Sequence, residues 1–341
     1  MKRIEISGGG LAGLALGIAL RNQDVPVTIF EAMRYPRHRV CGEFISGTSN
    51  HTWVTLGISD CLDDHKKHSD TAWFDNDGLL TRFTLPDPAL AVSRYLLDER
   101  LAKKFKKLGG VLRENTRSDF TSSSSQEGRM WCAGRKVNQG KGEWIGCKIH
   151  LRGIDMQAGL EMHLGNSGYA GLTAIEEDWI NLCGLFRLDP SLRVSKENFL
   201  PAQLAACGLS SLAQKVRAAE YRPQSFCGIA GFSLGKQASP HNTLGDAHSI
   251  IPPFTGNGMS MALQSAECAL PFLVAYSQNH IDWKQTLSSM EQALHQRFQS
   301  RLRWAGMLQN MLLSSFWQTP LKILISSGIA PLQPLFHLTR N

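Results

Sequence analysis

Apolar and polar positions near the N-terminus predict a parallel-sheet unit. Residues 3–7 predict a short strand, residues 11–21 an apolar helix, and residues 25–30 a second strand that ends at Glu31. A glycine-rich turn joins the first strand to the helix. Strand, turn, helix and strand in this order are typical of a βαβ unit, in which the two strands lie parallel.

The middle of the chain shows strand patterns. Alternation on both sides of Asp77-Gly78, from Ala72 to Leu85, predicts a hairpin with a tight turn. From Trp144 onward, short apolar runs are separated by glycine, asparagine and acidic turn residues, which predicts a series of antiparallel strands. These strands are expected at residues 145–151, 160–164, 169–175 and 179–185.

The C-terminal third is predicted to be mainly helical. Residues 195–218 have a helical pattern, and residues 283–315 predict one long amphipathic helix. Residues 316–338 are apolar but are interrupted by Pro320, Pro331 and Pro334. This stretch has two interpretations, a docked tail that covers a substrate pocket and a peripheral membrane contact. The docked tail is preferred because interfacial helices need a cleaner polar face.

Together these elements predict an α/β protein with a Rossmann-type domain, an inserted antiparallel-sheet substrate domain and C-terminal helices. The expected Rossmann-type domain takes residues 1–70, 92–140 and 222–282, the substrate domain residues 71–91 and 141–221, and the helical region residues 283–341. No run of 18 apolar residues occurs, so no transmembrane helix is expected.

Composition and charge narrow the classes of partner. The formal net charge is +7, and 43% of the residues are hydrophobic, which supports a substantial core and argues against global disorder. The basic residues are scattered, without the interleaved aromatic residues of a single-strand binder, so no nucleic-acid partner is expected. No obligate protein partner is indicated either.

The cysteines and histidines do not predict a metal site. None of the 8 cysteines forms a CxxC pair, so a structural zinc site is not expected. His150 and His163 fall on predicted neighbouring strands but lack a third ligand. Wide cysteine spacing fits reduced, buried thiols, and no signal peptide precedes the first strand, so a cytoplasmic protein is expected.

The first chemical motif is the turn Gly8-Gly9-Gly10-Leu11-Ala12-Gly13, which fits G-x-G-x-x-G. Gly8 permits a tight turn, Gly10 lets a pyrophosphate approach the backbone, and Gly13 lets the helix pack closely on the strand. The helix begins at Leu11 and Ala12 and offers unpaired N–H groups to the phosphates. Glu31 follows 18 residues after Gly13, where a partner for a ribose hydroxyl belongs. The motif therefore predicts a dinucleotide site.

A second motif indicates which dinucleotide. Leu244-Gly245-Asp246-Ala247-His248, followed by Pro252-Pro253 and Gly256-Asn257-Gly258, resembles the second FAD motif of the p-hydroxybenzoate hydroxylase and geranylgeranyl reductase superfamily. The resemblance covers most of residues 1–280 and makes the Rossmann-type domain an expected FAD-binding domain. It implies that Asp246, next to Gly245, accepts hydrogen bonds from the ribityl chain. It also implies that the loop with Gly256, Asn257 and Gly258 passes close to the flavin and starts a helix directed at the ring.

Two further segments carry the same resemblance. Ser93 to Asp98 begins a helix, and the resemblance places Arg94 at the FAD phosphate or ribityl region. Pro36 to Glu43 fits the P-x-x-x-x-C-G segment of geranylgeranyl reductases, which implies contacts of Arg39 with the cofactor phosphates and places Cys41 near the ring. The alternatives are a surface ion pair for Arg94 and a buried apolar role for Cys41.

Other segments depart from the superfamily pattern. Ala133-Gly134-Arg135 stands where an Asp-Gly pair is usual, and Tyr169-Ala170-Gly171-Leu172-Thr173-Ala174 stands where geranylgeranyl reductases carry Y-x-W-x-F-P. Tyr169 is kept, whereas Gly171 would open the pocket, so a polyprenyl substrate does not follow. The W-x-W-x-I-P signature of flavin halogenases is absent.

The resemblance predicts an FAD-dependent oxidoreductase that acts on a hydrophobic small molecule. The P-x-x-x-x-C-G segment and the loop from Gly256 to Met259 favour a reductase or dehydrogenase. One alternative is a monooxygenase that hydroxylates an aromatic or polyketide-type substrate, and another is a non-catalytic FAD-binding partner protein. No second G-x-G-x-x-G is present, so electrons are expected from transient NAD(P)H or from another reductase.

The candidate catalytic residues are His248, Cys41, Glu43 and Tyr169. His248 follows the Gly-Asp pair and could shuttle a proton, with a packing role as the preferred alternative. Glu43 could act as an acid or base near the ring, and an exposed ion pair is equally compatible with the sequence. Cys41 and Tyr169 are selected by their places in the superfamily segments.

Overall fold

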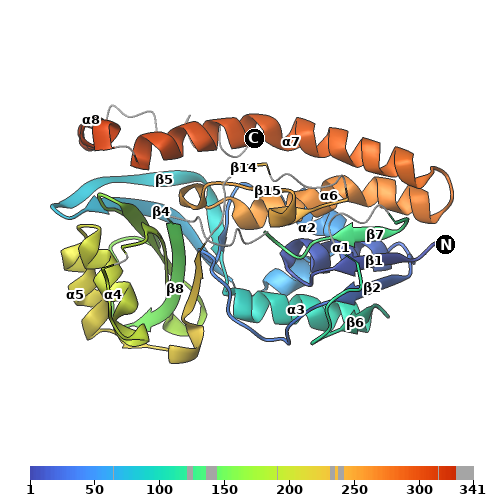
Figure 1. The fold of residues 1–341 in the computed structure, drawn as a ribbon, viewed down its shortest axis with the longest axis horizontal. Helices are drawn as coiled ribbons and strands as arrows, with labels where there is room; N and C mark the ends of the chain where they lie inside the picture. The colour runs from blue at the N-terminus through green and yellow to red at the C-terminus, as the bar shows by residue number, and fades with distance from the viewer. Residues whose placement is uncertain are drawn as a thin grey trace.

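The computed structural model describes residues 1–63, 65–120, 126–135, 144–189, 191–230, 235–236, 242–313 and 315–327. The protein has two halves, each built on a β-sheet, and one long helix extends along both of them (Figure 1). The predicted α/β class, with C-terminal helices, is therefore confirmed.

The first half contains the predicted parallel sheet. Its strands are parallel and lie in the order β6-β2-β1-β7. Trp131 also makes a parallel bridge with Thr243, which brings the chain just before Gly245 to the same sheet. The strands are β1 (Ile4–Ser7), β2 (Val27–Phe30), β6 (Val111–Arg113) and β7 (Arg129–Trp131). The carboxyl ends of these strands share one edge, which is where ligands bind in open α/β sheets.

Helices α1 (Leu11–Arg21) and α3 (Arg94–Lys107) pack within this half. α1 is buried over nearly its whole length, and a Cβ on its Gly17 would lie 2.7 Å from Cδ1 of Ile29. Only glycine allows this close approach of helix and strand. α3 begins directly after Ser93, whose hydroxyl accepts a hydrogen bond from the N–H of Leu96 at 3.1 Å. Ser93 is thus the N-cap that starts the predicted helix.

The second half contains a larger, mixed sheet in the order β12-β8-β11-β10-β9-β4-β5-β3, and β13 also pairs with β8. The predicted hairpin is confirmed, because β4 and β5 pair antiparallel on both sides of Asp77. The sheet is not wholly antiparallel, since β4 and β9 are parallel neighbours. The strands are β3 (Phe44–Ile45), β4 (Lys66–Asp75), β5 (Gly78–Ala91), β8 (Trp144–Arg152), β9 (Leu160–Leu164), β10 (Gly168–Ala174), β11 (Ile180–Arg187), β12 (Glu220–Tyr221) and β13 (Cys227–Ala230).

Helices cover one face of the mixed sheet. α4 (Lys196–Ala206) and α5 (Ser210–Ala218) occupy the predicted helical stretch, with a break at Gly208, whose φ is 86°. Leu200 and Leu212 pack there with Ile149 and Leu151 of β8 in one apolar cluster. The opposite face of the sheet, which carries Gly146, Lys148 and His150 on β8, is therefore turned toward the first half.

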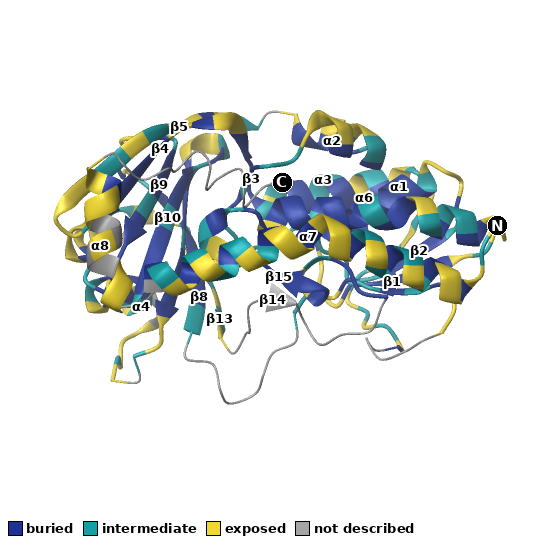
Figure 2. Ribbon diagram, turned by 90° about the horizontal axis from the view of Figure 1, so that it is seen from above, coloured by how far each residue is buried: buried dark blue, intermediate teal, exposed yellow. Residues whose placement is uncertain are grey.

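Three C-terminal helices follow the sheets. α6 (Gly258–Ser277) packs on α1, α7 (Trp283–Leu313) lies along α6, and α8 (Ser315–Ser326) ends the described chain. Figure 2 shows α1 and α6 largely buried beneath α7, whose outer face is exposed. In the apolar C-terminal stretch, Pro320 lies inside α8, whereas Pro331 and Pro334 fall outside the described residues.

A short helix and a two-stranded sheet lie in the connecting segments. α2 (Asn50–Leu56) lies between β3 and β4, and β14 (Gly235–Lys236) pairs with β15 (Ser249–Ile250) ahead of α6. Within the part of the chain that the structure describes, no helix combines the length and the apolar character needed to cross a bilayer.

Candidate functional site

A cleft of about 230 Å³ lies between the two halves and collects segments that are far apart in the sequence. The start of α1, the segment before β3, the start of α3, the loop before α6 and the inner face of the mixed sheet all contribute to its walls. The predicted site residues on these walls are Gly10, Leu11, Ala12, Arg39, Cys41, Arg94, Tyr169, Gly245, Asp246, Gly256 and Gly258. Residues of separate motifs thus meet at one place.

The other predicted site residues do not line the described part of this cleft. They are Gly8, Gly13, Glu31, Glu43, His248 and Asn257. Gly8 and Gly13 support the cleft from behind, because a Cβ on Gly8 would lie 2.4 Å from the carbonyl oxygen of Cys132 and one on Gly13 would lie 2.0 Å from that of Gly8.

Gly10 differs from its neighbours because a Cβ there would meet nothing within 4 Å. It is the N-cap of α1 and has no side-chain capping group, so the first N–H groups of the helix face the cleft. Free backbone N–H groups and the positive end of a helix bind anionic groups. The open space beside Gly10 therefore fits a phosphate.

Glu31 binds the protein's own groups. Its Oε2 accepts a hydrogen bond from the N–H of Gly9 at 2.9 Å and lies 2.6 Å from the guanidinium of Arg37. Its Oε1 accepts from the N–H of Met33 at 2.9 Å. Glu31 thus joins the glycine turn to the loop after β2, and its contact with a ribose stays a prediction.

Arg94 belongs to a buried ion cluster, not to a surface ion pair. Its Nε and Nη2 donate to the two oxygens of Asp98 at 2.7 and 2.8 Å, and Nε of Arg39 lies 3.4 Å from the same carboxylate. Burial would lower the pKa of Arg94, but the carboxylate of Asp98 outweighs it and raises the pKa. With Arg37 and Glu31, the network contains more cations than anions, which favours an anionic ligand.

Asp246 is exposed to the cleft in a 3-10 turn, η4 (Gly245–Ala247). Gly245 has a φ of 61°, a conformation that favours glycine, and its N–H donates to Oγ of Ser265 at 3.0 Å. The cleft walls shield Asp246 from water and raise its pKa, while the charges of Arg135 and Arg94 oppose this rise. A carboxylate in this position can accept hydrogen bonds from a polyol.

The loop before α6 is fixed to the mixed sheet. The N–H of Phe254 donates to the hydroxyl of Tyr169 on β10 at 3.0 Å. Gly256 has a φ of 66°, and a Cβ there would lie 2.2 Å from the ring of Phe44. A Cβ on Gly258, the first residue of α6, would meet nothing within 4 Å. Burial raises the pKa of Tyr169 above its ordinary value, so this hydroxyl stays protonated and anchors the loop.

Cys41 lines the cleft, whereas Glu43 is buried behind it. Oε1 of Glu43 accepts a hydrogen bond from Nζ of Lys148 at 2.6 Å, and Oε2 lies 2.7 Å from Nε2 of His150. Burial alone would raise the pKa of Glu43, but the charge of Lys148 and the hydrogen bond to His150 lower it overall. The alternative of an exposed ion pair is therefore wrong, because the pair is buried. Glu43 does not line the described cleft, and its acid–base role stays a prediction.

The three histidines considered in the sequence lie in separate places. His248 is buried behind η4, and its N–H donates to the carbonyl of Gly245 at 2.9 Å. A proton-shuttle role for His248 stays a prediction. His150 and His163 are not on neighbouring strands, because β11 and β10 lie between β8 and β9. Among the described residues, no group of three or more potential metal ligands is present.

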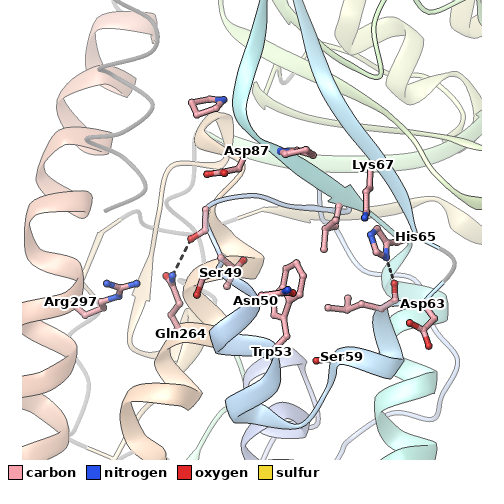
Figure 3. A pocket seen from close by; sticks show the side chains of 16 residues that line it. Ser49, Asn50, Trp53, Ser59, Asp63, His65, Lys67, Asp87, Gln264 and Arg297 are labelled. Atoms are coloured by element: carbon pink, nitrogen blue, oxygen red, sulfur yellow. Dashed lines mark hydrogen bonds between the residues drawn. The ribbon is translucent and has the colours of Figure 1, made fainter.

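A second cleft, of about 830 Å³, lies between α2, the start of β4 and α7. Figure 3 shows Trp53 and Asn50 on one wall, Lys67 opposite, and Arg297 reaching in from α7. The side chain of Gln264 donates to the carbonyl of Gly47 at 3.1 Å, which ties the wall to α6. None of the predicted site residues lines this cleft, and its walls carry charges of both signs.

Several residues in or behind the cleft were not predicted from the sequence as site residues. Arg135 lines the cleft near Asp246, whereas in the sequence it is only a departure from the usual Asp-Gly pair. Lys148, Asn181 and Thr173 hold the segment around Cys41 from the mixed sheet. The signal that could have found Lys148, Asn181 and Thr173 is that they are polar residues within predicted apolar strands.

Comparison with known proteins shows the fold. No family model matches the chain, and no curated protein matches it in sequence. The p-nitrophenol 4-monooxygenase PnpA from Pseudomonas putida has a TM-score of 0.78 at 12% identity, with 100% of this chain and 99% of that chain covered. PqsL from P. aeruginosa, in complex with 2-aminobenzoylacetate, has a TM-score of 0.73 at 15% identity, with 96% and 99% covered. A variant of Klebsiella pneumoniae HpxO complexed with FAD has a TM-score of 0.74 at 15% identity, with 99% of each chain covered.

Proposed function

We propose that this protein binds FAD in the cleft between its two sheets and acts as an FAD-dependent oxidoreductase. The convergence of the glycine turn, the arginine cluster, Asp246 and the loop before α6 in one cleft carries this proposal. Together they offer what FAD needs: N–H groups and cations for the diphosphate, and an acceptor for the ribityl hydroxyls. The shared fold with an FAD-bound variant of HpxO supports it further.

Each part of the cofactor has a matching part of the cleft. Gly10, Leu11 and Ala12 would hold the diphosphate, with Arg39 and Arg94 as its cations, and Asp246 would bind the ribityl chain. The glycine loop before α6 would lie beside the ring. When bound, FAD supplies the redox chemistry, and the protein supplies position, electrostatics and exclusion of water.

Of the two reactions, we favour hydroxylation of an aromatic small molecule by a monooxygenase. Two of the similar structures support this choice, since PnpA is named as a p-nitrophenol 4-monooxygenase and PqsL was solved with 2-aminobenzoylacetate. The cleft floor supports it as well. Gly146 on β8 and Gly171 on β10 line it without side chains, beside the apolar Leu185 and Met162. Apolar space of this kind suits an aromatic ring.

A reductase or dehydrogenase is the second candidate reaction. The placement of Cys41 on the cleft wall supports it, because this residue belongs to the segment that resembles geranylgeranyl reductases. In either reaction, transient NAD(P)H is the expected electron donor. A non-catalytic FAD-binding role is not favoured, because the cleft extends beyond the expected cofactor residues onto the apolar face of the sheet.

The test combines cofactor binding with turnover. Purified protein is loaded with FAD, reduced anaerobically with NADH or NADPH, and then exposed to labelled oxygen in the presence of phenols and aminobenzoyl compounds. We expect a hydroxylated product that contains the oxygen label. Reduction of the substrate without oxygen would select the reductase instead.

Controls separate the steps of this test. Chemical reduction with dithionite distinguishes an unsuitable nicotinamide donor from an absent reaction. A protein that shows no flavin absorbance after incubation with FAD would contradict the whole proposal.

A further inference from the structure

The segment Cys41–Gly42–Glu43 passes between the two halves in a conformation that needs support. Glu43 has a φ of 59°, a left-handed conformation that is unfavourable for a residue with a side chain. Its two preceding residues form part of the cleft wall, while its own side chain is 0% exposed. Strained backbone of this kind persists only where the surroundings hold it.

Side chains from three strands of the mixed sheet hold this segment. Lys148 and His150 on β8 bind the carboxylate of Glu43 at 2.6 and 2.7 Å. Nδ2 of Asn181 on β11 donates to the carbonyl of Cys41 at 2.9 Å, and Oγ1 of Thr173 on β10 donates to the carbonyl of Gly42 at 3.0 Å. The sheet thus fixes two peptide carbonyls and one carboxylate in a row.

Glu43 and Lys148 also contact residues of the first half and of the segment before β3. Oε1 of Glu43 also accepts a hydrogen bond from the N–H of Arg94, the first residue of α3, at 3.1 Å. Nζ of Lys148 lies 3.3 Å from Nδ1 of His38, whose ring stacks on Tyr95. Burial and the charge of Lys148 lower the pKa of His38 to about 4, so His38 is neutral at pH 7 and accepts from the ammonium group.

We infer that Glu43 and Lys148, with His150, form a clamp that positions the Cys41–Gly42 peptide on the cleft wall. Glu43 is in this view a positioning residue, since neither it nor Lys148 lines the described cleft. The inference rests on the proposed function only in naming FAD as the group that the positioned peptide contacts. The clamp links the cofactor half to the mixed sheet at the point where cofactor and substrate would meet.

The test measures the accessibility of Cys41 in the apoprotein, so it does not depend on FAD binding. Iodoacetamide labelling of Cys41 is followed by peptide mass spectrometry, with the half-buried Cys268 on α6 as an internal reference. Removing one partner of a buried ion pair leaves the other charge unpaired, so Glu43→Gln and Lys148→Met should each raise the Cys41-to-Cys268 labelling ratio about tenfold. The double variant lacks the same clamp, so its ratio should rise about as much as that of either single variant, without adding the two effects.

The matched control is Glu161→Gln, which removes one partner of the buried pair with His163 on β9, at 3.0 Å. This variant should leave the Cys41-to-Cys268 labelling ratio unchanged. An unchanged ratio in the folded single variants, an equal rise in Glu161→Gln, or a wild-type ratio in the double variant would overturn the clamp. If the single variants do not fold, Thr173→Val is tested instead, because it removes only the hydrogen bond to the carbonyl of Gly42. An unchanged labelling ratio in that variant would then overturn the clamp.

FAD affinity gives a second readout. If the wild-type protein binds FAD, the single variants should bind FAD more weakly and have a changed flavin absorbance spectrum, and the double variant should show both effects to a similar extent. If the wild-type protein binds no FAD, the proposed function fails while the labelling result still decides whether the clamp exists.

Discussion

Asp246 tests the cofactor site most directly at the scale of single residues. A hydrogen bond to a charged group contributes about 1.5–3 kcal/mol, so Asp246→Ala should raise the dissociation constant for FAD about 10- to 100-fold. Titration with FAD, followed by flavin fluorescence, measures this change. The control is Asp87→Ala, which removes an exposed acid from the second cleft and should leave FAD affinity unchanged. Equal affinity of the Asp246 variant and the wild type would contradict the role of Asp246.

The role of a single residue was predictable where the backbone conformation or the ligand requires that residue type. Gly8, Gly13 and Gly256 occupy places where a Cβ would collide with neighbouring atoms, so the glycine pattern alone indicated them. Glu43 was selected for its position, but its environment was not predictable. Its partner Lys148 is 105 residues away in the sequence, and nothing in the local pattern shows that both are buried.

At the scale of elements, Gly146 on β8 and Gly171 on β10 present no side chain to the cleft, and a Cβ can be added at Gly171 without strain. A Cβ there would be 3.6 Å from the nearest atom, an ordinary contact. Gly171→Leu should therefore leave the fold and FAD affinity intact but raise KM for an aromatic substrate about tenfold or more, because the new side chain occupies the cleft floor. The control is Gly228→Leu on β13, which does not line this cleft. An unchanged KM in the Gly171 variant would place the substrate elsewhere.

Most helices and strands were predictable because each is buried either on one face or along its whole length. The helices α1, α3 and α7 and the strands β8 to β11 appear where the apolar patterns predicted them. The parallel pairing of β4 with β9 was not predictable, because the apolar pattern of a strand does not show which distant strand it pairs with. β8 was misleading in another way. Its Lys148 and His150 alternate with apolar residues as if they faced solvent, yet both of its faces are covered.

The whole molecule makes the cleft by bringing its two halves together, and this arrangement depends on contacts that span the sequence. The motifs identified which segments meet, since the glycine turn, Arg94 and Asp246 all line the cleft. The motifs did not indicate which contacts fix the two halves relative to each other. Tyr169 bonding to the N–H of Phe254 and Lys148 bonding to Glu43 both cross between the halves. Such contacts form only in the folded protein, so they could not be predicted from one sequence.

These crossing contacts predict that a bound cofactor stabilises both halves at once. A ligand that binds only the folded state stabilises it by about 2.7 kcal/mol when its free concentration is about 100 times its dissociation constant. Hydrogen exchange with and without FAD should therefore show added protection in β1 and α1 and also in residues 168–187 of the mixed sheet. Asp246→Ala under the same conditions should show much less protection in both halves. Protection confined to the parallel-sheet half would mean that the mixed sheet is not coupled to the cofactor, even if FAD binds where we propose.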